Sequence, residues 1–132
     1  MSSPAALPPS SPPSPAAAAP GGWWAVCLCA AWCGTCGIYR PLFNELARAH
    51  PEVRFEWVDI EDESDLAGDL DVETFPTLLI ADGQRALFLG PLLPQAPVLA
   101  RLLASLQAAP GSAGAGGEAQ GVFERVRAAR SQ

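Results

Sequence analysis

Residues 24–36 read Trp-Ala-Val-Cys-Leu-Cys-Ala-Ala-Trp-Cys-Gly-Thr-Cys, and this stretch decides how the chain folds. Its first part, Trp24 to Cys29, is a continuous apolar run, which predicts a buried central strand. A helix is predicted to follow directly, from about Cys33 to Ala49. Its inward face is expected to carry the apolar residues at helical spacing, Ile38, Leu42, Phe43 and Leu46.

Downstream of this helix, turn signals separate five further elements. The pattern predicts a strand over residues 53–60 and a short acidic helix over 64–70, with Ser64 as its N-cap. Strands over 77–81 and 85–89 are expected to form a hairpin, and a last helix is expected over 97–107. The order is therefore β-α-β-α-β-β-α. Because a crossover helix joins the first two strands, they should be parallel, so the fold class is α/β with a mixed four-stranded sheet and helices on both faces.

Composition divides the chain into three parts. Residues 1–21 are rich in Pro, Ala and Ser and are expected to be a disordered tail. Residues 22–107 hold nearly all of the periodic apolar pattern and should form one domain. Residues 108–132 are expected to be a Gly/Ala-rich linker and a short basic segment. Val122 to Arg130 could form a helix, but a helix this short is unstable alone. It should therefore either dock on the domain or fray, and we expect fraying.

Charge and hydropathy exclude several classes of function. The chain has 132 residues with 14 acidic and 8 basic side chains, and its net charge is −6. This acidic balance argues against nucleic acid as a partner. No apolar run is long enough for a transmembrane helix, so no membrane is expected as a partner either. The N-terminus lacks the pattern of a signal peptide, and we therefore expect a cytoplasmic protein, most simply a monomer.

The chemistry of the chain is concentrated at Cys33 and Cys36. They lie where a buried strand is expected to end and a helix to begin, and a helix N-terminus favours an anionic thiolate. Thiolates attack disulfides, so Cys33 is predicted to form a mixed disulfide with a substrate. Cys36 lies one turn later and should resolve that intermediate, leaving a Cys33–Cys36 disulfide. A C-x-x-C pair alone is a weak signal, however, since it can also be half of a zinc site or arise by chance.

Two more cysteines, Cys27 and Cys29, precede this pair. Because they are two residues apart on a strand, their side chains should lie on the same face of the sheet. We favour buried, inert thiols that behave as small apolar side chains. Cys29 lies nearest the active-site end, however, and could be oxidised or form an off-pathway bridge. The alternatives are a second redox pair or, together with Cys33 and Cys36, a four-thiolate metal or cluster site.

A second motif, Phe75-Pro76-Thr77, precedes a predicted buried strand. An X-Pro bond at the start of a strand can be cis. A cis bond here would expose the backbone of Phe75 beside Cys33, where an extended substrate could pair with it. For Pro76 taken alone, a simple boundary between loop and strand is the better explanation.

Taken together, these motifs closely resemble the thioredoxin family. The resemblance covers about residues 23–107 and rests on Trp32 to Cys36, Pro41 within the helix, Val72 to Thr77, the Asp82–Gly83 turn and Gly90. It implies a thioredoxin fold with Pro76 in the cis form next to the dithiol. It further implies dithiol–disulfide exchange on protein substrates. The substrate-binding groove is then expected to be formed by Trp32, Gly34, Thr35, Phe75, Pro76 and Gly90.

The sequence also departs from the family pattern. Cys27 stands where thioredoxins carry a buried Asp, and Trp57 stands where a Lys usually accompanies it. Proton transfer at Cys36 would then depend on water, Glu56 or Asp59. Thr35 replaces the commonest Pro and Gly37 a basic residue. The strand and helix that open the family fold are missing, so one edge of the sheet is expected to be exposed.

The resemblance implies a protein-disulfide reductase that needs no organic cofactor and no metal. Its electron donor would be a reductase of the thioredoxin-reductase type or a small thiol. Two alternatives stay open. One is a thioredoxin-like binding module with a redox-sensitive dithiol and little turnover, which the missing Asp and Lys favour. The other is a cysteine-ligated metal or cluster protein.

Overall fold

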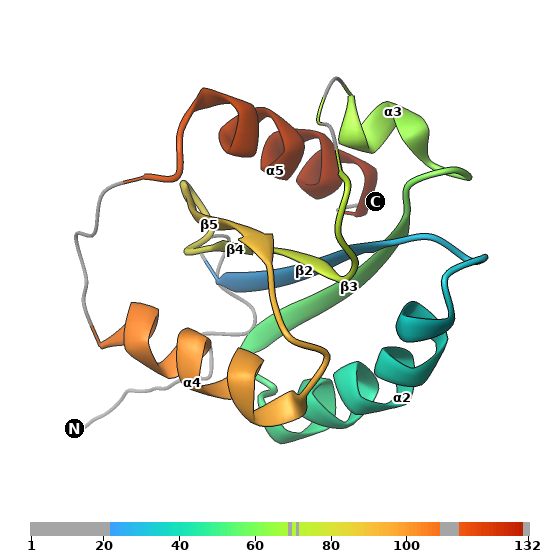
Figure 1. Cartoon of the computed structure of the whole chain (residues 1–132). Coiled ribbons are helices and arrows are strands. Elements are labelled where there is room, and N and C mark those ends of the chain that lie inside the picture. The colour runs from blue at the N-terminus through green and yellow to red at the C-terminus, as the bar shows by residue number, and fades with distance from the viewer. Residues whose placement is uncertain (1–21, 69, 71, 109–113, 131–132) are drawn as a thin grey trace, which may run out of the picture.

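In a computed structural model, the described residues are 22–68, 70, 72–108 and 114–130. They form four strands and four helices (Figure 1). In chain order these are β2 (Trp23–Cys29), α2 (Gly34–Ala49), β3 (Val53–Asp59), α3 (Ser64–Ala67), β4 (Thr77–Ala81), β5 (Ala86–Pro91), α4 (Ala96–Gln107) and α5 (Gly117–Arg130). The predicted tail, residues 1–21, lies outside the described residues.

The four strands form one mixed sheet in the order β3-β2-β4-β5. β2 is parallel to β3, whereas β4 is antiparallel to both β2 and β5. The predicted α/β fold with a mixed four-stranded sheet is therefore confirmed. In this register Thr77 lies opposite both Leu28 and Pro91. The end of β2, the start of β4 and the end of β5 therefore lie side by side at the same end of the sheet.

Alternation along β2 separates the core into two layers. Ala25, Cys27 and Cys29 face α2 and α4, while Trp24, Val26 and Leu28 face α5. Figure 1 shows α2 and α4 on one side of the sheet and α5 with α3 on the other. Every β2 residue from Trp24 onward is buried, as expected for a central strand covered on both faces.

The C-terminal helix corrects the expectation that this segment frays. α5 buries Ala119, Val122, Phe123 and Val126 against the second face of the sheet. Arg130 adds ion pairs to Glu63 and Glu56, at 2.7 and 3.0 Å. The short-helix argument was wrong here because tertiary burial, not helix propensity, stabilises α5. The packed domain therefore extends beyond residue 107, and much of the predicted linker before α5, residues 109–113, lies outside the described residues.

Two smaller expectations also differ from the structure. Ile38 is 70% exposed, because α2 turns the stripe Cys36, Tyr39, Phe43 and Leu46 toward the sheet. α3 begins at Ser64 itself and has Glu63 as N-cap, since the turn before it is closed by the Glu63 amide donating to the Asp59 carbonyl. Within the described part of the chain, no helix is long and apolar enough to cross a membrane.

Candidate redox site

Cys33 is the N-cap of α2 and the last residue of a tight turn that follows β2. Its backbone is extended, and its amide donates to the Ala30 carbonyl at 3.0 Å. The Cys33 carbonyl accepts the amide of Gly37 at 3.3 Å. The thiol is thus held at the positive end of a 16-residue helix, where the free amides favour an anion. Its side chain is partly exposed and not disulfide-bonded.

Asp59 at the end of β3 anchors the turn from the other side. Its carboxylate accepts hydrogen bonds from the amides of Ala31, Glu61 and Asp62, at 3.0, 2.9 and 3.2 Å. These amides, that of Glu61 most, hold the pKa of the Asp59 carboxyl below its usual range. Asp59 therefore acts as an ionised clamp on the loop, which makes it a poor proton acceptor.

Glu56, the other carboxylate considered for proton transfer, is also engaged elsewhere. It pairs with Arg130 at 3.0 Å and with Arg54 at 2.8 Å. The expectation that Glu56 or Asp59 serves Cys36 gains no support from these contacts.

The contact between Trp32 and Phe75 places the Phe75-Pro76-Thr77 motif next to the turn that holds Cys33. Their rings meet edge to face with centroids 5.6 Å apart. The Trp32 indole N–H donates to Glu61 Oε2 at 2.8 Å, which orients a ring that is 66% exposed. The Phe75–Pro76 peptide bond is cis, as the family resemblance implied.

The remaining predicted site residues lie at the end of the sheet where β2 ends and β4 begins. Gly34 is exposed, and a Cβ there would meet nothing within 4 Å, so the side of the turn next to Cys33 is open. Thr35 is half-buried one residue later. Gly90 lies opposite Leu78, one pair from the end of the sheet. The groove itself, as a place where substrate binds, stays a prediction.

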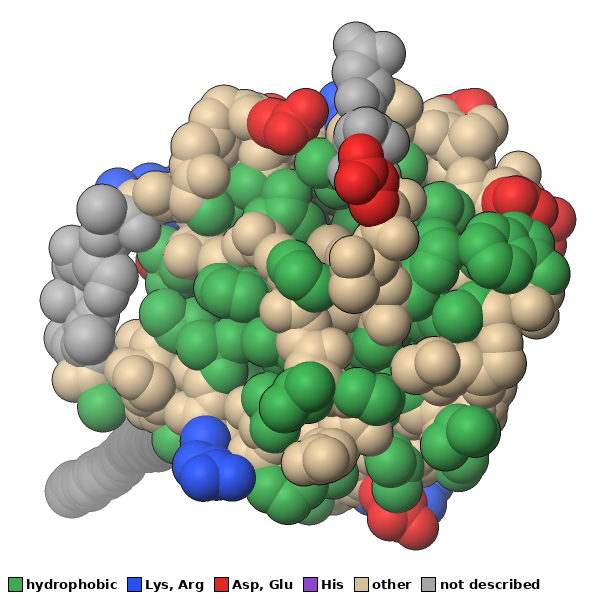
Figure 2. Space-filling view, viewed as in Figure 1, with side chains coloured by type: hydrophobic (Ala, Val, Ile, Leu, Met, Phe, Trp, Pro, Cys, Tyr) green, Lys and Arg blue, Asp and Glu red, His purple; other side chains and the backbone are tan. Residues whose placement is uncertain are grey.

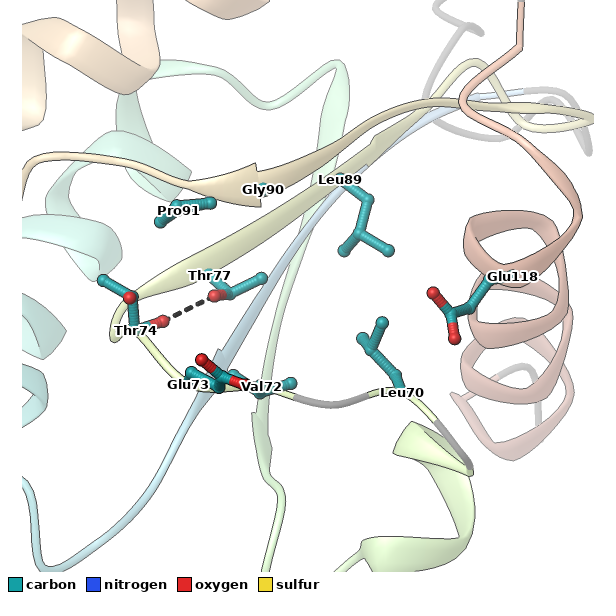
Figure 3. Close-up of a pocket in the computed structure, with 9 residues that line it drawn as sticks. All are labelled: Leu70, Val72, Glu73, Thr74, Thr77, Leu89, Gly90, Pro91 and Glu118. Atoms are coloured by element: carbon teal, nitrogen blue, oxygen red, sulfur yellow. Dashed lines mark hydrogen bonds between the residues drawn. The ribbon is translucent and has the colours of Figure 1, made fainter.

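Gly90 and Thr77 also line a pocket of about 320 Å³ between the Pro76 turn and α5. Figure 3 shows the dashed hydrogen bond from the Thr77 hydroxyl to the Thr74 carbonyl, which measures 2.6 Å. The apolar part of the lining consists of Leu70, Val72, Leu89 and Pro91. Two carboxylates, Glu73 and Glu118, give the pocket an acidic character.

The disulfide in this structure joins Cys29 to Cys36, not Cys33 to Cys36. This differs from the predicted redox pair and from the expectation that Cys29 is inert. The cause is the register of the turn: it folds α2 back over the end of β2 and places the two Cα atoms 5.9 Å apart, within disulfide range. Cys36 is 2% exposed and Cys29 is fully buried, so the bond lies beneath the surface.

Cys27 is the second free cysteine among the four, and it is fully buried. Its Sγ lies 3.9 Å from Cys29 Sγ, in the geometry of a weak thiol donor. The prediction that Cys27 and Cys29 share a face is thereby confirmed. Burial raises the pKa of the Cys27 thiol far above its usual range, so this thiol stays protonated and unreactive.

The cysteines do not assemble into the alternative metal site. Across residues 22–68, 70, 72–108 and 114–130, no group of three or more His, Cys, Asp or Glu side chains is placed to hold a metal ion. The donor geometry thus gives no support to the four-thiolate interpretation.

The surface at the site includes an exposed apolar side chain. The large apolar side chains that are most exposed are Trp32, Ile38 and Leu93, and Trp32 directly precedes Cys33. On the face seen in Figure 2, hydrophobic side chains gather over the middle and charged ones lie mainly toward the margins. Exposed apolar surface of this kind is typical of a protein-interaction site.

A partly exposed cysteine at a helix N-terminus, with a second cysteine one turn later on a mixed α/β sheet, is an arrangement typical of thiol-based redox proteins. The sequence model of the family described as Thioredoxin matches residues 21–90. The chain belongs to the thioredoxin family. Among curated relatives, the H-type thioredoxin of Picea mariana is 43% identical over 61 residues, which is 46% of this chain and 49% of that protein. Thioredoxin-3, mitochondrial, of Saccharomyces cerevisiae is 38% identical over 56 residues, or 42% of this chain and 44% of that protein.

The chain spans about half the length of the curated relatives it matches. Solved structures extend the likeness in fold. The thioredoxin of Fasciola hepatica superposes with a TM-score of 0.59 at 25% identity, covering 64% of this chain and 81% of that one. Oxidised mitochondrial thioredoxin 3 of Saccharomyces cerevisiae gives 0.58 at 23% identity, covering 65% and 80%. Both agree with the thioredoxin-like fold expected from the motifs.

Proposed function

We propose that this chain is a thiol–disulfide oxidoreductase that reduces protein disulfides, with Cys33 as nucleophile and Cys36 as resolving thiol. One observation carries the proposal: Cys33 is the accessible thiol of the four cysteines, at the N-terminus of α2 beside Trp32 and Phe75. The family membership supports the same chemistry.

The exchange proceeds in two steps. Cys33 thiolate attacks one sulfur of the substrate disulfide; a Cys33–substrate bond forms, and the other substrate sulfur leaves as a thiolate that takes a proton. Cys36 thiolate then attacks Cys33 Sγ and releases the second substrate thiol. The substrate gains two electrons and the chain loses them as a disulfide. An external dithiol or a reductase returns these electrons.

Substrate is proposed to lie across Trp32 and Phe75, toward Gly90. Its class is a protein with an accessible disulfide. One similar structure carries a title on thiol resolution in a yeast mitochondrial 1-Cys peroxiredoxin via glutathione and thioredoxin systems, so an oxidised peroxiredoxin is a reasonable substrate to assay. The reducing direction needs a compartment that keeps thiols reduced, and we propose the cytoplasm.

The test is reduction of insulin disulfides driven by dithiothreitol. The wild-type protein should accelerate the reaction catalytically. With the Cys33→Ser variant, the rate of insulin reduction should fall to that of dithiothreitol alone. Cys27→Ala is the matched control, because it removes a buried thiol that takes no part in the two steps. Wild type no faster than dithiothreitol would refute the proposal.

The Cys29–Cys36 bond favours a second candidate function, a partner-capturing module. With Cys36 engaged, a mixed disulfide at Cys33 has no resolving thiol one turn away and persists. Weak turnover combined with stable mixed disulfides in wild type would favour this module over the reductase.

A further inference from the structure

Cys36 has two possible disulfide partners in this site. Cys29, the last residue of β2, is bonded to it in the structure. Cys33 precedes it by three residues at the start of the same helical turn, a spacing that places side chains on one face. Cys33 also packs against the buried cluster that holds Cys27, Cys29 and Cys36.

The two partners differ in their access to solvent. Cys29 is fully buried, whereas Cys33 is partly exposed. An external disulfide or oxidant therefore meets Cys33 first. A bond between Cys29 and Cys36 has to form inside the protein, and the simplest route is transfer from a disulfide that Cys33 has already made.

We propose that Cys29 is a third redox-active cysteine, which displaces Cys33 from Cys36 by disulfide exchange and so stores the oxidised state beneath the surface. This inference rests on the proposed function for the first step, in which Cys33 is oxidised.

The exchange balances in atoms and electrons. Cys29 loses its proton, and the thiolate attacks Cys36 Sγ of the Cys33–Cys36 disulfide. The Cys29–Cys36 bond forms, the Cys33–Cys36 bond breaks, and Cys33 leaves as a thiolate that takes up one proton. No electrons enter or leave, because one disulfide is replaced by another.

Cys27 is the positioning residue for this step. Its thiol lies 3.9 Å from Cys29 Sγ and donates toward it. Because burial keeps Cys27 protonated, it can stabilise a thiolate on Cys29 without competing as a nucleophile.

The consequence is a change in what the surface presents. With Cys33–Cys36 closed, neither thiol of the pair is free. With Cys29–Cys36 closed, Cys33 is again a free thiol at the docking surface and lacks a resolving partner. Oxidation would thus convert a turnover site into a site that captures disulfide-bearing partners.

Disulfide mapping of the full chain tests the exchange. Reduced protein is oxidised with one equivalent of diamide, which takes up the two electrons and two protons, then quenched in acid at successive times and alkylated after denaturation. Trypsin leaves all four cysteines in one peptide, because the first basic residue is Arg40. Chymotrypsin cuts after Leu28 and Trp32 and thus separates Cys27, Cys29 and the Cys33–Cys36 peptide from one another.

We expect Cys33–Cys36 to appear first and Cys29–Cys36, with alkylated Cys33, to accumulate later. Oxidation of the Cys29→Ala variant should stop at the Cys33–Cys36 disulfide. Cys33→Ser should form Cys29–Cys36 at least about tenfold more slowly, because it lacks the exposed first thiol. Cys27→Ala should reach the wild-type map more slowly, because it lacks the thiol that stabilises the Cys29 thiolate. Glu45→Gln, at an exposed position of α2, is the control and should match wild type in both rate and final map.

Two outcomes would overturn the inference. One is a wild type that ends as Cys33–Cys36 with Cys29 fully alkylated. The other is a Cys33→Ser variant that forms Cys29–Cys36 as fast as wild type, since the bond would then arise without exchange.

Thiol counting on folded protein gives a second readout. Oxidised wild type should show about one accessible thiol, and oxidised Cys29→Ala close to none. Neither measurement depends on turnover with insulin. A chain that exchanges but does not reduce insulin refutes only the proposed function, and a chain that reduces insulin but never forms Cys29–Cys36 refutes only this inference.

Discussion

Cys27 lies in the middle of β2 with its side chain fully buried, opposite Trp57 on β3. In the family pattern a buried Asp and a Lys occupy these two positions. The structure surrounds Cys27 with apolar neighbours, among them Tyr39 and Leu78. A thiol and an indole are compatible with such a site, whereas a buried carboxylate is costly there, because burial outweighs the attraction of Arg40, whose guanidinium stacks on the Trp57 ring.

Restoring the family's carboxylate should therefore destabilise the protein. Cys27→Asp is expected to lower the free energy of unfolding by about 3 kcal/mol or more, since burial of the charge at this position outweighs the attraction of Arg40. Cys27→Ala, the matched control, should cost about 1 kcal/mol, because it removes a single buried sulfur. Urea unfolding of the reduced proteins measures both. Equal midpoints for the two variants would show that the site accepts a charge.

The strand–turn–helix around Cys33 has a local physical signature, and the sequence predicted it from periodicity. The cis Phe75–Pro76 bond was expected only from the family resemblance, because Pro76 alone fits a simple boundary between loop and strand. The sequence left a bridge of Cys29 open but did not assign its partner, Cys36. Alternation on the strand placed Cys29 correctly on the face of α2, but the height at which α2 crosses the end of β2 depends on the Ala30–Cys33 turn, and spacing alone does not determine it.

At the scale of elements, α5 closes a face that residues 22–107 alone would leave open. Phe123 is fully buried and meets the ring of Trp24 edge to face, with centroids 5.8 Å apart. Arg125 donates to the carbonyls of Leu66 and Ala67 and thus ties α5 to α3. The sequence showed the apolar stripe of this helix; it did not show that the stripe had a surface to cover, because that surface is formed only when the sheet assembles.

Truncating the α5 anchor should test this packing. Phe123→Ala is expected to lower the free energy of unfolding by about 3 kcal/mol or more, from lost burial and a cavity. Glu124→Ala, on the exposed side of the same helix, should change it by less than about 0.5 kcal/mol. Thermal and urea unfolding measure the difference. Similar small losses in both variants would mean that α5 contributes little to the fold.

The ion pair between Glu63 and Arg130 makes the docking of α5 depend on pH. The Arg130 hydrogen bonds hold the pKa of Glu63 below its ordinary value of 4.5. A depressed pKa in the folded state gives stability that is fully present above pH 4.5 and is lost as the pH falls through the lower folded value.

Glu63→Gln should therefore be less stable than wild type at neutral pH, and the gap should close as the pH falls below 4.5. Glu45→Gln, at an exposed position of α2, should show no such pH-dependent gap. Unfolding curves recorded at steps of pH measure both variants. A gap for Glu63→Gln that is the same at acid and neutral pH would contradict the assignment of this stability to ionised Glu63.

On the scale of the whole molecule, the chain carries a net charge of −6. Some of its carboxylates form ion pairs that hold the fold together, and others lie at the redox site. Between Glu56 and Glu73 lie nine acidic residues and no basic one. A solvated surface is the ordinary role of such a run. The structure uses Glu56 and Glu63 to hold α5 through Arg130. Glu61, by contrast, lies at the rim of the redox site, where it accepts the hydrogen bond from Trp32.

This distribution should favour cationic substrates through the rate of encounter. Glu61 borders Trp32, and the pocket beyond the Pro76 turn adds Glu73 and Glu118. A disulfide peptide flanked by Lys should be reduced about threefold or more faster than the same peptide flanked by Glu at low salt. The difference should shrink at about 0.5 M salt, because screening shortens the range of the field.

Glu61→Gln provides the sharpest variant, since an amide oxygen can still accept the Trp32 hydrogen bond while the charge is removed. This variant should lower the ratio of the reduction rate of the Lys-flanked peptide to that of the Glu-flanked peptide at low salt. At high salt its reduction rate should stay close to that of wild type. Glu45→Gln, at an exposed position of α2 outside the site, removes the same charge from the molecule and should narrow the preference less. If both variants act equally, the preference comes from net charge alone; if the preference persists unchanged at high salt, it comes from direct contacts and steering is refuted.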